Sequence, residues 1–256
     1  MDAARKSEAK LPRMFKKPDP LPQRRHLLLI GAPRSGTTLL ATMIGRHTEV
    51  GMVNEDVTGQ GIRKVLGKQL TGNKLCVPNQ IRLARRHFFA AKALKSLGLV
   101  TEAPKSKYSI HDYLDLPNLK LVAIIRDAGA SISSMMVRGS KKFRKAARRW
   151  AEAIETIDEI KHQYQDRVLV VNFEDLLLQP EVILRQVCVF LNLGFQEPML
   201  RAYEDNPYYP GVRLDAEKAR PQRENGVDSE VAILAPGAYK KYQALAAEAR
   251  GILGNP

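Results

Sequence analysis

The chain has 256 residues and a formal net charge of +14, from 41 Lys and Arg against 27 Asp and Glu. No apolar run approaches the roughly 20 residues of a membrane-spanning helix, and two cysteines are too few for a disulfide framework. We therefore expect a soluble, intracellular protein, cytoplasmic in location, whose positive charge serves solubility or an anionic partner.

The first 25 residues, rich in Lys, Arg and Pro, predict a basic flexible tail, and residues 26–256 predict a single domain. Basic residues gather in this tail and again over residues 138–149. A non-catalytic module that binds nucleic acid or another polyanion is one interpretation of this charge. Aromatic residues are scarce at 6%, and no nucleic-acid motif stands beside either cluster, so a nucleic-acid partner is not expected.

Short apolar runs alternate with helical segments from residue 26 onward. Three continuous apolar runs predict strands covered on both faces, as in a parallel sheet: Leu27–Ile30, Leu119–Ile125 and Val168–Val171. "GNKLCVPN", residues 72–79, predicts a further strand. Helices are predicted over Thr37–Arg46, 142–165, Val182–Leu193 and 236–253, and a basic helix or insertion over 82–97. This alternation indicates an α/β fold of the three-layer, P-loop type, with helices flanking a central parallel sheet.

The stretch "GAPRSGTT", from Gly31 to Thr38, joins the first strand to the first helix. It nearly matches the phosphate loop G-x-x-x-x-G-K-[ST], but Thr37 occupies the lysine position. In such a loop, backbone N–H groups converge on an anion and the helix N-terminus adds positive potential. Without the lysine that contacts two phosphates in nucleoside-triphosphate enzymes, the loop suits one phosphate group. The predicted ligands are Arg34, Ser35, Gly36, Thr37 and Thr38.

The longer stretch "GAPRSGTTLL" resembles the 5′-phosphosulfate loop of the sulfotransferases that use 3′-phosphoadenosine-5′-phosphosulfate (PAPS). A second stretch, "KLVAIIRDAGASISSMMVRG", has Arg126 at a strand end, Ser134 eight residues later and Arg138 four beyond that. Sulfotransferases hold the 3′-phosphate with an Arg and a Ser at this spacing. A second Arg at the position of Arg138 is similar to the tyrosylprotein sulfotransferases. The resemblance implies that these three residues bind the 3′-phosphate and that the product is adenosine 3′,5′-bisphosphate (PAP).

A third stretch, "VLVVNFEDLLLQPEVILRQVCVFLNL", resembles the strand, Tyr-Glu-Asp-Leu, Pro and helix segment of the same family. Phe173 replaces a tyrosine that lies near the adenine in many relatives, which leaves stacking possible but removes a hydroxyl. Glu174 and Asp175 are expected to cap the helix or bond loop backbone. Trp150, the only tryptophan, lies on an amphipathic helix and is expected in the core rather than against the adenine.

Transfer of a sulfuryl group requires a base for the acceptor hydroxyl and a cation for the departing phosphate. Glu55, by its distance from the loop, resembles the catalytic base of the tyrosylprotein sulfotransferases. Asp56 is a second candidate base, and His47 a weaker one. Two lysines resemble the one that steadies the bridging oxygen: Lys74 in "GNKLCVP" and Lys105 in "APKSKYSI". Lys74 is preferred because it follows the base at a compact distance.

Together these features predict a PAPS-dependent sulfotransferase that acts on a hydroxyl-bearing acceptor of open class. The five histidines have no metal-ligand spacing, and no metal is expected. A P-loop kinase or NTPase is the alternative enzyme, with Asp127 in place of the strand-end aspartate that helps to bind Mg²⁺. The missing lysine at Thr37 and the arginine before Asp127 argue against it. Residues 56–118 are expected to shape the acceptor pocket.

Overall fold

The structure is a computed structural model that describes residues 24–59, 61, 65, 67–83, 106, 108–116, 118–201 and 227–251. Residues 1–23 of the predicted tail, residues 84–97 of the predicted basic helix, and Lys105 lie outside this part. The described elements are β1 (Arg25–Gly31), α1 (Thr37–Gly45), β2 (Val50–Asn54), β3 (Leu70–Cys76), α4 (Ile110–Leu114), β4 (Leu119–Ile125), α5 (Ala128–Gly139), α6 (Phe143–Gln163), η2 (Gln165–Arg167), β5 (Val168–Asn172), α7 (Phe173–Leu178), α8 (Pro180–Phe190), η3 (Glu197–Arg201), α9 (Val227–Leu234) and α10 (Pro236–Gly251).

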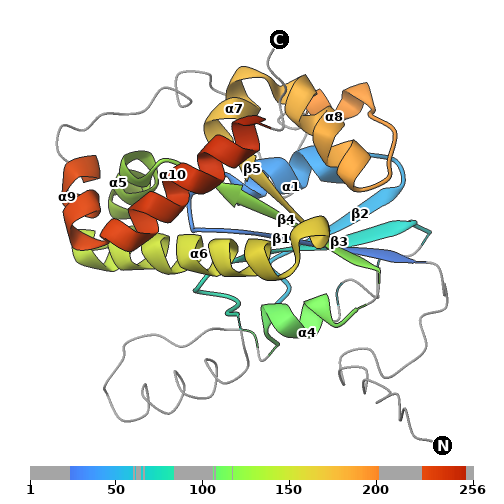
Figure 1. Cartoon of the computed structure of the whole chain (residues 1–256). Helices are drawn as coiled ribbons and strands as arrows, with labels where there is room; N and C mark the ends of the chain where they lie inside the picture. The colour runs from blue at the N-terminus through green and yellow to red at the C-terminus, as the bar shows by residue number, and fades with distance from the viewer. Residues whose placement is uncertain are drawn as a thin grey trace, which may run out of the picture.

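The five strands form one parallel sheet in the order β2-β3-β1-β4-β5 (Figure 1). The predicted α/β fold with a central parallel sheet is therefore confirmed. Gly31, at the end of β1, pairs with Cys76 of β3 and with Ile124 of β4. Because all strands run the same way, the segments that leave β1, β2, β3 and β4 meet at one edge of the sheet.

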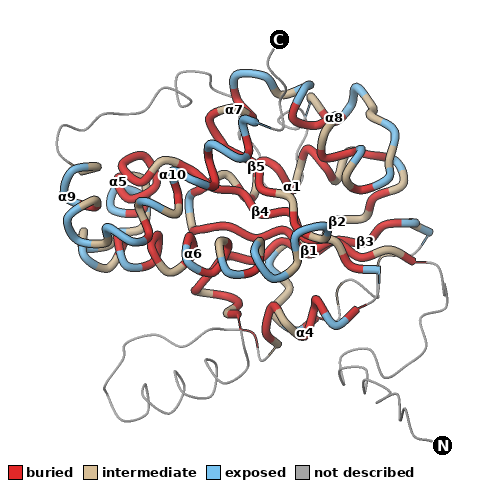
Figure 2. The backbone as a smooth tube through the Cα atoms, in the orientation of Figure 1, coloured by how far each residue is buried: buried red, intermediate tan, exposed pale blue. Residues whose placement is uncertain are grey.

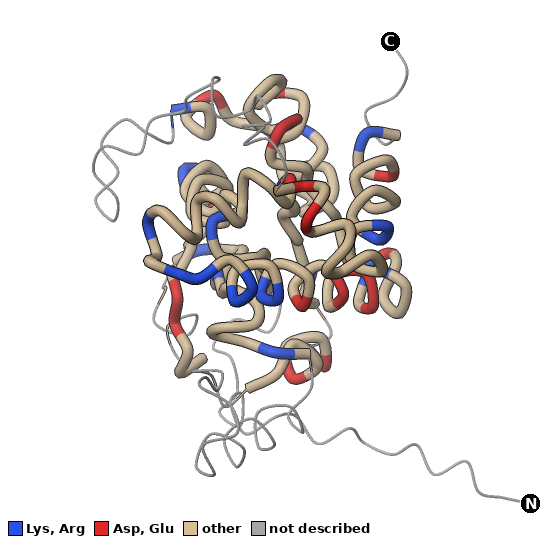
Figure 3. The backbone as a smooth tube through the Cα atoms, turned by 90° about the vertical axis from the view of Figure 1, so that its left-hand side faces the viewer, with Lys and Arg blue, Asp and Glu red and all other residues tan. Residues whose placement is uncertain are grey.

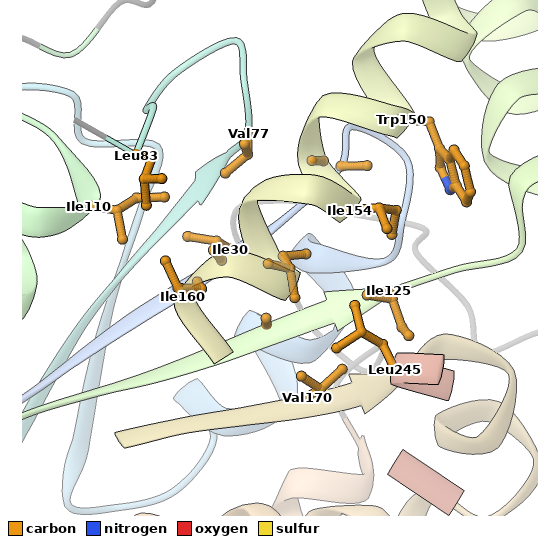
Figure 4. Close-up of a cluster of buried hydrophobic side chains, with 14 of the residues drawn as sticks. Ile30, Val77, Leu83, Ile110, Ile125, Trp150, Ile154, Ile160, Val170 and Leu245 are labelled. Atoms are coloured by element: carbon orange, nitrogen blue, oxygen red, sulfur yellow. The ribbon is translucent and has the colours of Figure 1, made fainter. Parts of the chain in front are cut away.

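Helices cover both faces of the sheet, and β1 shows why its sequence is apolar throughout. Leu28 and Ile30 pack among residues of α4, α6 and α10, whereas Leu27 and Leu29 pack among residues of α1, α7 and α8. All four side chains are 0% exposed. Figure 2 shows β1 and β4 buried between the two helical layers, and Figure 4 shows Ile30 and Ile125 facing α6.

Trp150 lies on the buried face of α6 and is 0% exposed, as predicted. Its indole Nε1–H donates a hydrogen bond of 3.1 Å to the main-chain carbonyl of Arg126, just beyond β4. Its ring meets Tyr242 of α10 edge-on, with centroids 5.6 Å apart. The tryptophan thus ties the end of β4 to the helical layer. In the part of the chain described, no helix is long and apolar enough to cross a membrane.

Candidate active site

The loop between β1 and α1 has the form of an anion-binding turn. Gly36, at the N-cap of α1, has a φ of 92°, in the left-handed region that favours glycine. A Cβ at this position would collide with the ring of Phe173. No side chain caps α1, and no acidic residue lies in its first turn. The backbone N–H groups at the helix start are therefore available to an external anion.

The hydroxyl groups of the loop are only partly directed toward such an anion. Ser35 Oγ donates a hydrogen bond of 2.7 Å to the carbonyl of Ala32, and the residue is fully buried. Thr37 Oγ1 lies 3.8 Å from Cys76 Sγ, at the end of β3. Thr38 is half-buried at the helix start. Of the predicted loop ligands, Ser35 and Thr37 thus have side chains that stabilise the loop itself.

Three predicted phosphate ligands come together at the ends of β1 and β4. Arg34, whose φ is 71°, donates from Nε to Ser134 Oγ at 3.1 Å. Arg126 Nη1 donates to the main-chain carbonyl of Arg34, also at 3.1 Å. Arg138 lies one helical turn beyond Ser134 on α5. The side chain of Arg34, which the sequence assigned to the 5′-phosphosulfate, therefore belongs to the cluster predicted to bind the 3′-phosphate.

This arginine cluster has an excess of positive charge. Arg126 is 8% exposed, and its buried Nε has no hydrogen-bond partner among the described residues. Burial lowers the pKa of Arg126; Glu174 and Asp127 oppose this shift, whereas Arg34 and Arg138 add to it. Burial, followed by repulsion from Arg138, also lowers the pKa of Arg34. A bound anion would relieve this repulsion and supply a partner for the buried Nε.

The positive charge continues from this cluster onto the outer surface. Figure 3 shows Lys and Arg gathered where α5 ends and α6 begins. The basic residues of this stretch that are exposed or half-buried are Arg138, Lys141, Lys142, Arg144, Lys145 and Arg148. No acidic residue lies between Asp127 and Glu152. An anion that approaches the arginine cluster from this side therefore passes a group of exposed basic side chains.

Phe173, the first residue of α7, packs against Arg126 and the loop between β1 and α1. It is 6% exposed, and the guanidinium carbon of Arg126 lies 4.4 Å from its ring centroid. Its ring also packs close to Gly36. A tyrosine at this position was linked by resemblance to the adenine. Here the ring packs against Arg126 and the loop.

Glu174 bonds loop backbone, as predicted, and does not cap the helix. Its Oε1 accepts a hydrogen bond of 3.3 Å from the Asp127 N–H, and Oε2 is buried with no hydrogen-bond partner in the described part of the chain. The cap of α7 is Asn172, whose Oδ1 accepts from the Asp175 N–H at 3.0 Å. Burial raises the pKa of Glu174 to about 7. This carboxyl group is therefore held beside Asp127 in a poorly solvated position.

Glu55 and Lys74 form an ion pair at the adjoining strands β2 and β3. Lys74 Nζ lies 2.7 Å from Glu55 Oε1, and the Glu55 N–H donates to the Lys74 carbonyl at 2.9 Å. Lys74 is 1% exposed, whereas Glu55 is 42% exposed. The pair therefore has a buried cation and a carboxylate that solvent, or an acceptor, can reach.

Cys76 lies between the ion pair and the loop that joins β1 to α1. Lys74 and Cys76 are two residues apart in β3, so their side chains leave the same face of the strand. The Cys76 thiol contacts Thr37 of the loop. Burial raises its pKa, and the charges of Lys74, Glu55 and Arg34 all act on it. Sequence reasoning missed Cys76, although its position two residues after Lys74 in a strand indicates this shared face.

The other candidate bases, Asp56 and His47, accept or donate hydrogen bonds within loops. Asp56 Oδ1 accepts hydrogen bonds from the backbone N–H and the hydroxyl of Thr58, so its carboxylate shapes the loop after β2. His47 is 2% exposed, and its Nδ1 accepts from the Glu49 N–H at 3.1 Å. Its Nε2–H consequently donates to the Gly194 carbonyl at 2.8 Å. These hydrogen bonds of Asp56 and His47 are made to loop backbone and to Thr58, whereas Glu55 is paired directly with Lys74.

Asp127 serves as the N-cap of α5, because its Oδ1 accepts from the Ala130 N–H at 2.9 Å. This structural role differs from that of the magnesium-binding aspartate considered for a kinase. Among the residues that the structure describes, no group of three or more His, Cys, Asp or Glu could hold a metal ion.

The family model described as "Sulfotransferase family" matches residues 27–197, from β1 to the start of η3. This chain belongs to the sulfotransferase family. The protein-tyrosine sulfotransferase of Drosophila melanogaster is 26% identical over 195 residues, which are 68% of this chain and 39% of that protein. Protein-tyrosine sulfotransferase 1 of Danio rerio is 27% identical over 198 residues, 68% of this chain and 55% of that protein. The chain thus spans about half the length of these curated relatives or less.

Solved structures share the fold of this chain. The sulfotransferase domain of the Synechococcus PCC 7002 olefin synthase has a TM-score of 0.54 at 17% identity, covering 83% of this chain and 94% of that one. Mouse sulfotransferase SULT7A1, solved in complex with PAP, has a TM-score of 0.52 at 13% identity, covering 89% of each chain. At these identities the likeness shows the fold alone.

Proposed function

We propose that this protein is a PAPS-dependent sulfotransferase that transfers a sulfuryl group to a hydroxyl acceptor, with Glu55 as the base. The observation that carries the proposal is the Glu55–Lys74 ion pair, which lies beside a phosphate loop without its lysine. Lys74 supplies from the neighbouring strand the cation that Thr37 does not provide. A kinase would need a metal-bridged phosphate chain, whereas the phosphate groups of PAPS can be held by backbone N–H groups and arginines.

The residues present fit PAPS at two separate places. The uncapped N-terminus of α1 suits the 5′-phosphosulfate, because its backbone N–H groups lack side-chain partners. The cluster of Arg34, Arg126, Ser134 and Arg138 suits the 3′-phosphate, since it includes the buried Arg126 Nε without a partner among the described residues. When bound, PAPS supplies the sulfuryl group and a phosphate that departs from it.

The chain's own residues then have distinct tasks. Glu55 accepts the proton of the acceptor hydroxyl as that oxygen forms its bond to sulfur. Lys74 donates a hydrogen bond to the oxygen that is released from sulfur, where negative charge develops. The arginines would hold the phosphate groups of the nucleotide. Because Glu55 is partly exposed and Lys74 is buried, the acceptor approaches from the side of the glutamate.

The relatives named protein-tyrosine sulfotransferases support a protein tyrosine as the first acceptor to test. The experiment measures transfer of radioactive sulfate from PAPS to a tyrosine-containing peptide and to 4-nitrophenol. Thermal unfolding is followed in parallel with PAP, ADP and ATP, each with and without Mg²⁺. A ligand at 100 times its Kd adds about 2.7 kcal/mol, which is enough for a clear rise in Tm.

Stabilisation by PAP without metal, together with a weaker effect of ADP, is the expected result, because ADP lacks a 3′-phosphate for the arginine cluster. Stabilisation only by ATP with Mg²⁺ would instead indicate a kinase. Binding to polyanions with no stabilisation by any nucleotide would indicate a non-catalytic basic module. Glu55→Gln separates binding from chemistry: it should retain the PAP-induced rise in Tm and lower kcat by about 10²-fold or more, to a residual rate that can still be measured.

A further inference from the structure

The amide of Asn73, next to Lys74 in β3, is fully buried and makes three hydrogen bonds. Its Nδ2 donates to the Asp56 carbonyl at 2.8 Å and to the Tyr113 hydroxyl of α4 at 3.1 Å. Its Oδ1 accepts from the Asp56 N–H at 3.3 Å. The Asn73 side chain thus hydrogen-bonds both the N–H and the carbonyl group of Asp56. Asp56 directly follows Glu55, so this contact fixes the chain beside the proposed base.

The backbone of Glu55 is held from both sides. Before it, β2 pairs with β3, and the Glu55 N–H donates to the Lys74 carbonyl at 2.9 Å. After it, Asn73 holds Asp56. Between these points Glu55 has a φ of 57°, a left-handed conformation that residues with a Cβ rarely adopt. Such a conformation persists only where the surroundings enforce it.

We propose that Asn73 is a positioning residue, which enforces the left-handed turn at Glu55 and so keeps the carboxylate on Lys74. The side chains of adjacent strand residues point to opposite faces of the sheet. Asn73 therefore bonds the Asp56 backbone on the face that α4 covers, while Lys74 pairs with the Glu55 carboxylate on the opposite face. Without the amide, the Glu55–Asp56 peptide can relax to an ordinary conformation and carry the carboxylate away from the amine. The amide of Asn73 both donates to and accepts from Asp56, which leucine at this position cannot do.

The expected effect of Asn73 on catalysis rests on the proposed function. A double-mutant cycle tests whether Asn73 affects kcat through Glu55. Transfer of sulfate from PAPS to the tyrosine peptide is measured for Asn73→Leu, Glu55→Gln and the double variant. Asn73→Leu should lower kcat by about 30-fold, because misplacement of a catalytic group by about 1 Å can cost about 100-fold. In the Glu55→Gln background the same change should lower kcat by less than about 3-fold, since Asn73 acts through Glu55.

Two variants serve as controls. Thr71→Val changes another fully buried polar residue of β3, which is hydrogen-bonded to His26 Nδ1 at 3.2 Å, and should leave kcat and PAP affinity unchanged. Tyr113→Phe removes only the third partner of Asn73 and should have a much smaller effect than Asn73→Leu. If Tyr113→Phe lowers kcat as much as Asn73→Leu, the amide acts through α4 rather than through Glu55, and the proposal is overturned.

A second measurement does not depend on activity. Hydrogen exchange of the amides at residues 55–58 should be at least about tenfold faster in Asn73→Leu than in the wild type, and unchanged in Thr71→Val. Asn73→Ser, a smaller polar change, replaces Asn73→Leu if the latter does not fold. Unchanged exchange in the variant overturns the proposal whatever the acceptor is. Full activity of Glu55→Gln, by contrast, contradicts the proposed function and leaves the exchange result to decide the role of Asn73.

Discussion

Glu55 and Lys74 differ in burial, and this difference decides how each substitution acts. Glu55→Gln keeps an oxygen for the buried Lys74 amine, so we expect a loss of about 1 kcal/mol in the free energy of unfolding and a fall in kcat of about 10²-fold or more. Glu55→Ala leaves the ammonium without its partner and should cost about 2 kcal/mol more. Denaturant unfolding and initial rates measure the two effects separately.

The matched control for this pair lies on the surface. Arg185 Nη2 and Glu181 Oε1 are 2.7 Å apart on α8, and both side chains are more than half exposed. Glu181→Gln should change the free energy of unfolding by less than about 0.5 kcal/mol, because water screens exposed pairs. Equal effects of Glu55→Gln and Glu181→Gln on transfer would contradict a catalytic role for Glu55.

Glu174 predicts a pH dependence of stability. Its pKa is raised to about 7 in the folded protein, mainly by burial, from 4.5 in the unfolded chain. A carboxyl group with a raised folded pKa binds its proton more tightly in the native state, so stability falls as pH rises from about 4.5 to about 7. The loss is on the order of 3 kcal/mol, since one pKa unit corresponds to about 1.4 kcal/mol. Glu174→Gln should remove this part of the pH dependence.

The measurement is the free energy of unfolding of the wild type and of Glu174→Gln at several pH values. Burial also raises the pKa of the neighbouring Asp127, so both proteins should show a remaining slope of the same sign. The difference between the two curves belongs to Glu174. Parallel curves from pH 4.5 to pH 8 would show that this carboxyl group titrates normally.

At the scale of elements, the turn into α1 depends on α7. Gly36→Ala introduces a Cβ at a φ of 92° and against the Phe173 ring, and should lower the free energy of unfolding by about 2–3 kcal/mol. Phe173→Leu in the same chain should recover part of that loss, because it removes the ring atoms that collide. Thermal unfolding of both single variants and the double variant measures this coupling. Strict additivity would indicate that only the backbone conformation matters.

The start of α5 offers a test of the kinase alternative. Asp127 caps this helix, and Asn is as good an N-cap as Asp. Asp127→Asn should therefore change the free energy of unfolding by less than about 0.5 kcal/mol and leave sulfate transfer intact. A magnesium-binding aspartate would respond differently, since Asn carries no charge for the metal. Loss of nucleotide binding in a stable Asp127→Asn variant would favour the metal-dependent enzyme.

The elements differ in how well the sequence predicts them. β4 matches its predicted bounds, and β1 and β5 extend the predicted runs by at most two residues at either end, because strands covered on both faces are apolar throughout. β2 was not predicted, since Val50–Asn54 is short, includes Gly51 and lies at the sheet edge. The helix predicted from Val182 starts at Pro180, which favours the first helical position.

The individual residues of the candidate site were predictable from the sequence, but the contacts between them were not. The positions of Glu55 and Lys74 followed from spacing and resemblance, whereas their contact depends on β2 lying beside β3, which no local pattern encodes. The roles of Asn73 and Phe173 were hidden for the same reason. Each acts on a residue from another element, and burial of a polar side chain in a strand becomes visible only in the folded chain.

At the scale of the whole molecule, the charge distribution predicts a salt-dependent affinity. The positive surface from Arg138 to Arg148 adjoins the arginine cluster, and PAP carries several negative charges. Raising salt from 0.05 to 0.5 M should weaken PAP binding by about tenfold, because exposed charges are screened. Arg144→Gln with Arg148→Gln should reduce this dependence without changing kcat. Calorimetric titration at several salt concentrations measures it, and a flat response would contradict long-range attraction.

The strand order also places the proposed donor-binding residues and the proposed base on different flanks of the sheet. β1 is central: the residues proposed to bind the nucleotide follow β1 and β4, while the proposed base Glu55 follows β2 and Lys74 lies in β3, on the opposite flank of the sheet. Under the proposed function, substitutions after β2 and β3 should therefore alter the choice of acceptor more than the affinity for PAP. This flank is the place to engineer a new acceptor.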